Sequence, residues 1–77
     1  MELIYLLARV DVGRLEEVVH RLREIREVAD VQAVTGAYDV IVKVEAERIP
    51  TAFGVVLQRI RRIPGVLATE TLVAVGR

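Results

Sequence analysis

The sequence predicts a small α+β domain whose six elements follow the order strand, helix, strand, strand, helix, strand. Four apolar stretches rich in strand-forming residues are separated by two stretches whose apolar residues recur at helical spacing. A Gly36-Ala37 turn divides the two middle strands, and Pro64-Gly65 ends the second helix. This order is that of the split βαβ, or ferredoxin-like βαββαβ, arrangement, which has a four-stranded antiparallel sheet.

The first strand and the first helix lie before residue 28. Leu3 to Val10 is a nearly continuous apolar run, which is typical of a buried strand. Asp11 or Gly13 can open the helix that follows. Its apolar residues recur three and four positions apart, and charged residues fill its other face. These apolar residues are Leu15, Val18, Val19, Leu22 and Ile25.

The middle of the chain predicts a hairpin. Val31 to Thr35 and Tyr38 to Glu45 are its strands, and Gly36-Ala37 is the turn between them. Because side chains alternate along a strand, Tyr38, Val40, Val42 and Val44 share one fully apolar face. We expect that face to contact the core.

The second helix begins near Pro50, whose fixed φ and missing N–H suit a first helical turn. Pro64-Gly65 stops this helix, and the last strand runs from Val66 to Val75. The predicted apolar stripe of the helix consists of Ala52, Phe53, Val56, Leu57, Ile60 and Ile63.

An internal repeat supports the same order of elements. A shift of 35 positions superposes one βαβ half on the other. The aligned pairs are Val18 with Phe53, Leu22 with Leu57, Ile25 with Ile60 and Val28 with Ile63. The same shift puts Ile4 and Leu6 in phase with Asp39 and Ile41, and therefore on the sheet face opposite to Val40.

Composition excludes several classes of function. Hydrophobic residues make up 53% of the 77 residues, which predicts one folded domain over residues 1–77 rather than a disordered chain. The sequence has no Cys and one His, His20, which is expected at the surface. Thiol chemistry is therefore excluded, and we expect no metal site and no cofactor.

Charge and hydropathy also argue against two kinds of partner. Eleven Lys and Arg balance eleven Asp and Glu, so direct binding to nucleic acid is not expected. The cluster Arg59, Arg61 and Arg62 is interpreted as a solvated helix end. No apolar run reaches the roughly 18 residues of a membrane span, and the N-terminus lacks a positively charged region. We expect a cytoplasmic protein without a membrane partner.

Two helices cover only one face of a four-stranded sheet, so the other face needs a partner. Strand alternation predicts that this open face carries Ile4, Leu6, Ala8, Val10, Val34, Ile41, Leu67, Val73 and Val75. Covering several hundred Å² of apolar surface is a gain of about 10 kcal/mol before association costs. We therefore predict a homodimer packed sheet against sheet. Glu70 falls on the core face in this alternation, which indicates a bulge or an edge position.

Two segments carry recognisable motifs. Val34–Val44 contains Gly-x-Tyr-Asp, and Ile60–Thr71 contains an isoleucine, Pro-Gly-Val and Thr-x-Thr. Together they resemble the effector domain of the Lrp/AsnC family of transcriptional regulators, also called the regulation of amino-acid metabolism (RAM) domain. The resemblance covers essentially the whole chain. It implies a ferredoxin-like dimer of the dimeric α/β-barrel type that assembles further, with an amino-acid effector held between dimers.

The resemblance also implies the ligand-binding residues Gly36, Tyr38, Asp39, Thr69 and Thr71. An Asp carboxylate can hold an amino-acid ammonium, and the N–H groups of a glycine turn can hold its carboxylate, with hydroxyls as further donors. Strand alternation places Asp39 on the same sheet face as both threonines. Each residue also has a plainer interpretation: a turn glycine, a hairpin acceptor, a packed tyrosine and two strand-forming threonines.

Family regulators also carry an N-terminal helix-turn-helix domain. Here the first strand begins at residue 3, so we expect no DNA-binding domain and a module that senses an amino acid alone or with full-length regulators as partners. Two alternatives stay open. One is a structural oligomerisation module without a ligand. The other is a small enzyme of the dimeric α/β-barrel type, for which Tyr5, Tyr38 and Arg9 are the candidate residues.

Overall fold

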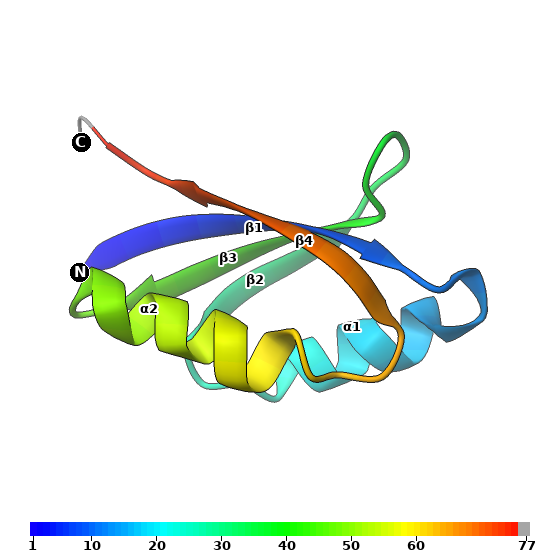
Figure 1. The fold of residues 1–77 in the computed structure, drawn as a ribbon, viewed down its shortest axis with the longest axis horizontal. Coiled ribbons are helices and arrows are strands. Elements are labelled where there is room, and N and C mark those ends of the chain that lie inside the picture. The colour runs from blue at the N-terminus through cyan, green and yellow to red at the C-terminus, as the bar shows by residue number, and fades with distance from the viewer. Residues whose placement is uncertain (76–77) are drawn as a thin grey trace.

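The computed structural model describes residues 1–75, and its elements follow the predicted order (Figure 1). The strands are β1 (Glu2–Val10), β2 (Val28–Ala33), β3 (Val40–Ala46) and β4 (Val66–Val73). The first helical segment is a 3₁₀ turn, η1 (Val12–Arg14), followed by α1 (Leu15–Arg23). The second is α2 (Ile49–Val55), which continues as a π-helical turn, η2 (Val56–Ile60).

The four strands form one antiparallel sheet in the order β2-β3-β1-β4. Both helices lie on the same face of this sheet, as Figure 1 shows. The ferredoxin-like fold is thus confirmed. The other face of the sheet, called the open face below, is not covered by any element of residues 1–75.

The core lies between the helices and the sheet, and β1 contributes the residues that were expected on the open face. In the register of β1 with β3, Ile4 lies opposite Val44, Leu6 opposite Val42, and Ala8 opposite Val40. The fully buried core strand residues include Ile4, Leu6, Val40, Val42 and Val44. Because β1 is apolar on both faces, alternation alone did not determine which face points inward.

The predicted face of β4 was wrong as well. Thr69 lies opposite Ala8 and Thr71 opposite Leu6, so both threonines point to the helix-covered side. Glu70 lies opposite Leu7 and points to the open face in regular pairing. The register shift in this ladder lies between Arg9 and Val10 instead. The expected edge position of Glu70 is confirmed, because β4 is an edge strand.

Of the nine residues expected on the open face, the ladders place only Ile41 there, opposite Leu7. Four of the nine, Ile4, Leu6, Ala8 and Val10 of β1, are buried in the core. Val73 lies opposite Ile4 on the helix side. Leu67 lies at the register shift, and Val34 and Val75 lie outside β2 and β4. The apolar residues that the strand pairing does place on the open face are Leu3, Tyr5, Leu7, Ile41, Ala68 and Leu72.

The two halves repeat at a spacing of 38 residues, not 35. The amide of Ile25 donates to the carbonyl of Leu22 at 3.1 Å, and the amide of Ile63 donates to that of Ile60 at 3.1 Å. The following pair of hydrogen bonds also matches. The Val28 amide donates to the Ile25 carbonyl at 3.0 Å, and the Val66 amide donates to the Ile63 carbonyl at 3.1 Å. Leu57, expected in the buried stripe, is therefore the counterpart of Val19 and is 53% exposed.

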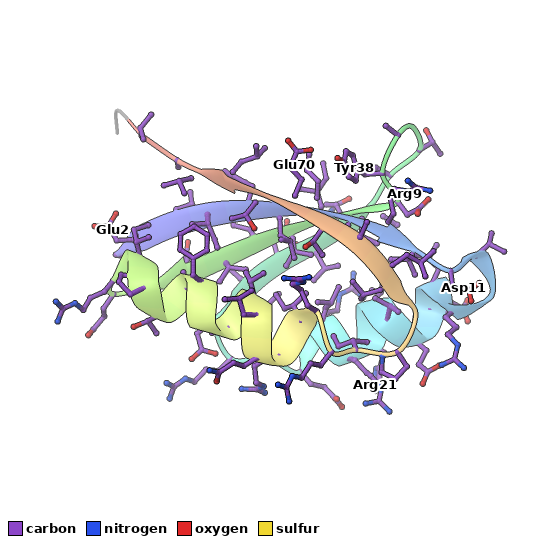
Figure 2. All side chains as sticks on the ribbon, viewed as in Figure 1. Glu2, Arg9, Asp11, Arg21, Tyr38 and Glu70 are labelled. Carbon is purple, nitrogen blue, oxygen red and sulfur yellow. The ribbon has the colours of Figure 1, made fainter. Side chains whose placement is uncertain are left out.

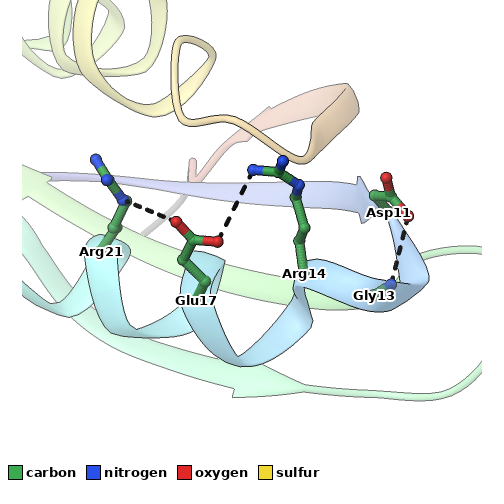
Figure 3. Close-up of polar contacts among 5 residues, drawn as sticks. All are labelled: Asp11, Gly13, Arg14, Glu17 and Arg21. Atoms are coloured by element: carbon green, nitrogen blue, oxygen red, sulfur yellow. Dashed lines mark hydrogen bonds and ion pairs between the residues drawn. The ribbon is translucent and has the colours of Figure 1, made fainter.

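The start of α1 is held by local polar contacts, drawn in Figure 3. The Asp11 carboxylate accepts a hydrogen bond from the Gly13 amide at 3.3 Å. Glu17 lies between Arg14 and Arg21, with N–O distances of 3.8 and 3.7 Å. These side chains are about half exposed, so each pair contributes little to stability. Their main effect is to orient the first turn of the helix.

Candidate functional site

The β2–β3 hairpin is fastened to the end of β1 by Asp39. Its amide donates to the Ala8 carbonyl at 2.9 Å, and its carbonyl accepts from Val34 at 2.8 Å. Its carboxylate oxygen Oδ2 accepts from the Val10 amide at 2.8 Å, which continues the sheet ladder by one bond past β3. The other oxygen, Oδ1, has no hydrogen-bond partner among residues 1–75. Asp39 is thus a hairpin acceptor that retains one free carboxylate oxygen.

The tip of the hairpin has the backbone of a glycine turn. Gly36 has a backbone φ of +137°, a value that residues other than glycine rarely adopt. It is exposed, and a Cβ built on it would meet no atom within 4 Å. The constraint at this position is therefore conformational, and there is open space around the turn for a ligand or a second chain.

Tyr38 connects the hairpin to β4 on the open-face side of the sheet, so its expected place on the core face with Val40 was wrong; it lies before β3, outside the regular alternation of that strand. Its hydroxyl donates a hydrogen bond to the Glu70 carboxylate Oε1. Figure 2 shows Tyr38, Glu70 and Arg9 together on the open-face side of the sheet. The hydrogen bond to Glu70 raises the pKa of the Tyr38 phenol above its ordinary value, and the positive charge of Arg9 opposes this only in part. The three side chains form a small polar group beside the apolar residues of the open face.

The Tyr38–Glu70 contact predicts a pH dependence. A raised folded-state pKa means that the contact stabilises the fold fully below the unfolded-state pKa of about 10 and is lost as pH rises through the folded-state value. We expect NMR titration of the Tyr38 ring to report ionisation above pH 10. Glu70→Gln should lower the pKa, because the neutral amide no longer favours the protonated phenol. A Tyr38 titration identical in both proteins would contradict the contact.

Thr69 and Thr71 lie in a different place from the hairpin. They line a groove of about 540 Å³ between the second helix and β4. Phe53, Val56 and Leu57 form the helix wall, and the start of β4 forms the other wall. Among residues 1–75, Arg61 is the only charged residue that lines the groove. One protomer therefore does not bring the five predicted ligand-binding residues together, because Tyr38 contacts Glu70 on the open face whereas both threonines point to the helix side.

Comparison with known proteins decides the family. The model of the Lrp/AsnC ligand binding domain matches residues 3–77. The chain belongs to this family. It is 32% identical over 71 residues to the HTH-type transcriptional regulator FL11 of Pyrococcus horikoshii, a match that covers 92% of this chain and 46% of FL11. The chain therefore spans about half the length of the curated relative.

Solved structures share the fold of this chain. TTHA0845 from Thermus thermophilus superposes on this chain with a TM-score of 0.94. The two are 32% identical, and the match covers 100% of this chain and 96% of TTHA0845. The complex of NMB0573 from Neisseria meningitidis with L-Met has a TM-score of 0.88 at 16% identity, over 97% of this chain and 50% of that one. At that identity the second match shows the fold alone.

The residues that sequence reasoning missed in this Lrp/AsnC domain are Glu70 and Arg61. Simple alternation put Glu70 on the core side, and the cost of burying an unpaired carboxylate indicated the bulge or edge position that was predicted, but its contact with Tyr38 was not foreseen. Arg61 was interpreted as part of a solvated helix end, and only the register of β4 shows that it lines a groove. His20 is exposed as expected, 3.4 Å from Glu24. No helix within residues 1–75 is long and apolar enough to cross a bilayer.

Proposed function

We propose that this Lrp/AsnC domain is a regulatory module that binds an amino-acid effector and acts in transcriptional or metabolic regulation through oligomerisation. The observation that carries the proposal is the match to the family's ligand-binding domain over residues 3–77. NMB0573, which has the same fold, forms a complex with L-Met. FL11, a relative of this chain, is an HTH-type transcriptional regulator.

The geometry of the hairpin supports an effector site at an interface between copies. Asp39 keeps one carboxylate oxygen free for a ligand ammonium, and the Gly36 turn presents backbone to open space. Thr69 and Thr71 lie on the other side of the sheet, so they reach the same ligand only from a second copy. We therefore place the effector where the hairpin of one copy meets β4 of another.

The open face supports oligomerisation. Leu3, Tyr5, Leu7, Ile41 and Leu72 lie together on a face that no helix of residues 1–75 covers. Tyr5 is 36% exposed and Leu72 is 44% exposed. Covering such a face by a second copy removes apolar area from water and supplies the core that a short chain lacks. A purely structural oligomer would use this face alone and would not respond to amino acids.

A thermal-shift screen against the twenty amino acids tests the proposal. An effector at one hundred times its Kd should stabilise the protein by about 2.7 kcal/mol. Asp39→Asn keeps an oxygen that accepts from Val10 but removes the charge, so the stabilisation should disappear while the oligomer persists. Asp30→Asn is the matched control on the exposed strand β2 and should keep the full shift. Failure of every amino acid to raise the melting temperature would leave the structural oligomer as the better account.

A further inference from the structure

A small cavity lies between the two helical segments near their C-terminal ends, on the side of the molecule away from the open face. Its volume is about 180 Å³, and it is lined by Arg21, Glu24, Ile25, Arg59 and Ile63. The 38-residue repeat pairs Arg21 with Arg59 and Ile25 with Ile63. The cavity is therefore built from equivalent residues of the two halves of the chain.

The two isoleucines fix the positions of the two arginines. Ile25 is 4% exposed and Ile63 is 8% exposed, so both are anchored in the core. Each donates its amide to the carbonyl three residues earlier at 3.1 Å, so the two helical segments end in the same way. Arg21 and Arg59 lie in the last turns of α1 and η2, four residues before these isoleucines. The cavity thus has an apolar floor and one arginine from each helical segment.

The positive charge at this cavity is only partly balanced. The Arg59 side chain makes no hydrogen bond or ion pair with any residue from 1 to 75. Arg21 has an ion pair with Glu17 at 3.7 Å that is about half exposed. Among residues 1–75, Glu24 is the only acidic residue that lines the cavity. Two guanidinium groups therefore share the cavity with one carboxylate, and an anionic ligand would reduce their repulsion.

We propose that this cavity binds a phosphate dianion, free or as the monoester group of a small metabolite, between Arg21 and Arg59. A guanidinium donates two parallel hydrogen bonds, so a single arginine already satisfies a carboxylate. A phosphate monoester group has three acceptor oxygens and about 1.5 to 2 negative charges near neutral pH, which match two arginines. The isoleucine floor supplies no donor, so the affinity comes from the two arginines.

This ligand and this place in the fold are separate from the amino acid and the hairpin of the proposed function. None of the residues that line the cavity lines the groove between the second helix and β4. Because the cavity lies on the helix side of the sheet, a second copy packed on the open face leaves it accessible. The phosphate site therefore does not depend on the effector site.

Glu24 weakens the proposed site, because its carboxylate repels a bound dianion. Removing this charge by Glu24→Gln should tighten phosphate binding by about threefold or more, the size of effect expected of one partly exposed charge. Glu16→Gln is the matched control. It removes the same charge from the same helix, but Glu16 lines a different groove, beside β2. Its effect on the affinity should be much smaller.

The test is an NMR titration of the uniformly ¹⁵N-labelled protein at constant ionic strength and about pH 7.5, where the phosphate group is mostly dianionic. Inorganic phosphate and glycerol 3-phosphate are the two probes. We expect the amide signals of Ile25 and Ile63 to shift with one common dissociation constant. Arg59→Gln should weaken binding about fivefold or more through the loss of a charge-assisted contact. Arg48→Gln, at the start of the second helix, removes an equal charge and should change the affinity little.

The two probes distinguish the source of the phosphate group. Tighter binding of glycerol 3-phosphate assigns the site to monoesters, and equal or weaker binding assigns it to the free ion. Three results would overturn the inference: no shift of these signals by either probe at millimolar concentration, equal affinities in Arg59→Gln and Arg48→Gln, or equal effects of Glu24→Gln and Glu16→Gln. All four substituted residues are exposed, so the spectra of the variants should show a native fold.

Discussion

If the proposed oligomer forms through the open face, replacing Leu7 by glutamate is expected to convert it into a folded monomer. Leu7 lies in the central strand β1, opposite Ile41 on β3 and Glu70 on β4, in the middle of the open face. A glutamate there adds a second negative charge beside Glu70 and would have to lose its water at a sheet-to-sheet interface. We expect the dissociation constant to rise at least about 30-fold, which corresponds to about 2 kcal/mol at a central interface residue.

Sedimentation velocity over a range of protein concentrations measures this change, with circular dichroism as the check on folding. Val12→Glu is the matched control, since Val12 is an apolar residue that is 95% exposed in the 3₁₀ turn η1, outside the strands that form the open face. It should leave the oligomer intact. If Leu7→Glu retains the wild-type sedimentation coefficient at every concentration, the open face is not the interface.

Leu6→Ala should have a different effect, although Leu6 is the adjacent residue. Leu6 is completely buried and lies opposite Val42 and Thr71 beneath the helices. Its truncation removes buried methyl groups and leaves a cavity, which typically costs about 2–5 kcal/mol. In a domain of this size that is a large part of the free energy of unfolding, so we expect a marked drop in the urea midpoint.

Leu57→Ala is the control for Leu6→Ala, because Leu57 is 53% exposed at the edge of the groove between the second helix and β4. It should lower the free energy of unfolding by less than about 1 kcal/mol. Both variants and the wild type must be compared at one protein concentration, since the proposed self-association would contribute to the apparent stability. Equal losses in the two variants would contradict the inward direction of the Leu6 side chain.

The order of elements was predictable because each depends on local signals: apolar periodicity, Pro50, Gly36-Ala37 and Pro64-Gly65. The face of each strand was not, because it depends on register. Side chains in a strand alternate between its two faces, so an error of an odd number of positions in the repeat spacing moves every aligned strand residue to the opposite face. A shift of 38 positions pairs Ile4 with Val42 and places both in the core, as observed, whereas a shift of 35 pairs Ile4 with Asp39.

The same distinction applies to the candidate site: its local parts were predictable from the sequence, and the relation between them was not. The hairpin motif placed Tyr38 and Asp39 together because they are adjacent in sequence. The relation of Thr69 and Thr71 to that hairpin needed the pairing of β4 with β1, which the sequence does not contain locally. Arg61 looks like any exposed helix-end arginine until its neighbours on β4 are known.

Sedimentation velocity of the wild-type protein at micromolar concentration, with and without each amino acid, tests the central proposal most directly. A ligand-binding module that acts through oligomerisation should sediment as a dimer or larger species, and at least one amino acid should change the distribution. A monomer that no amino acid alters would contradict both the oligomeric interface and the effector site.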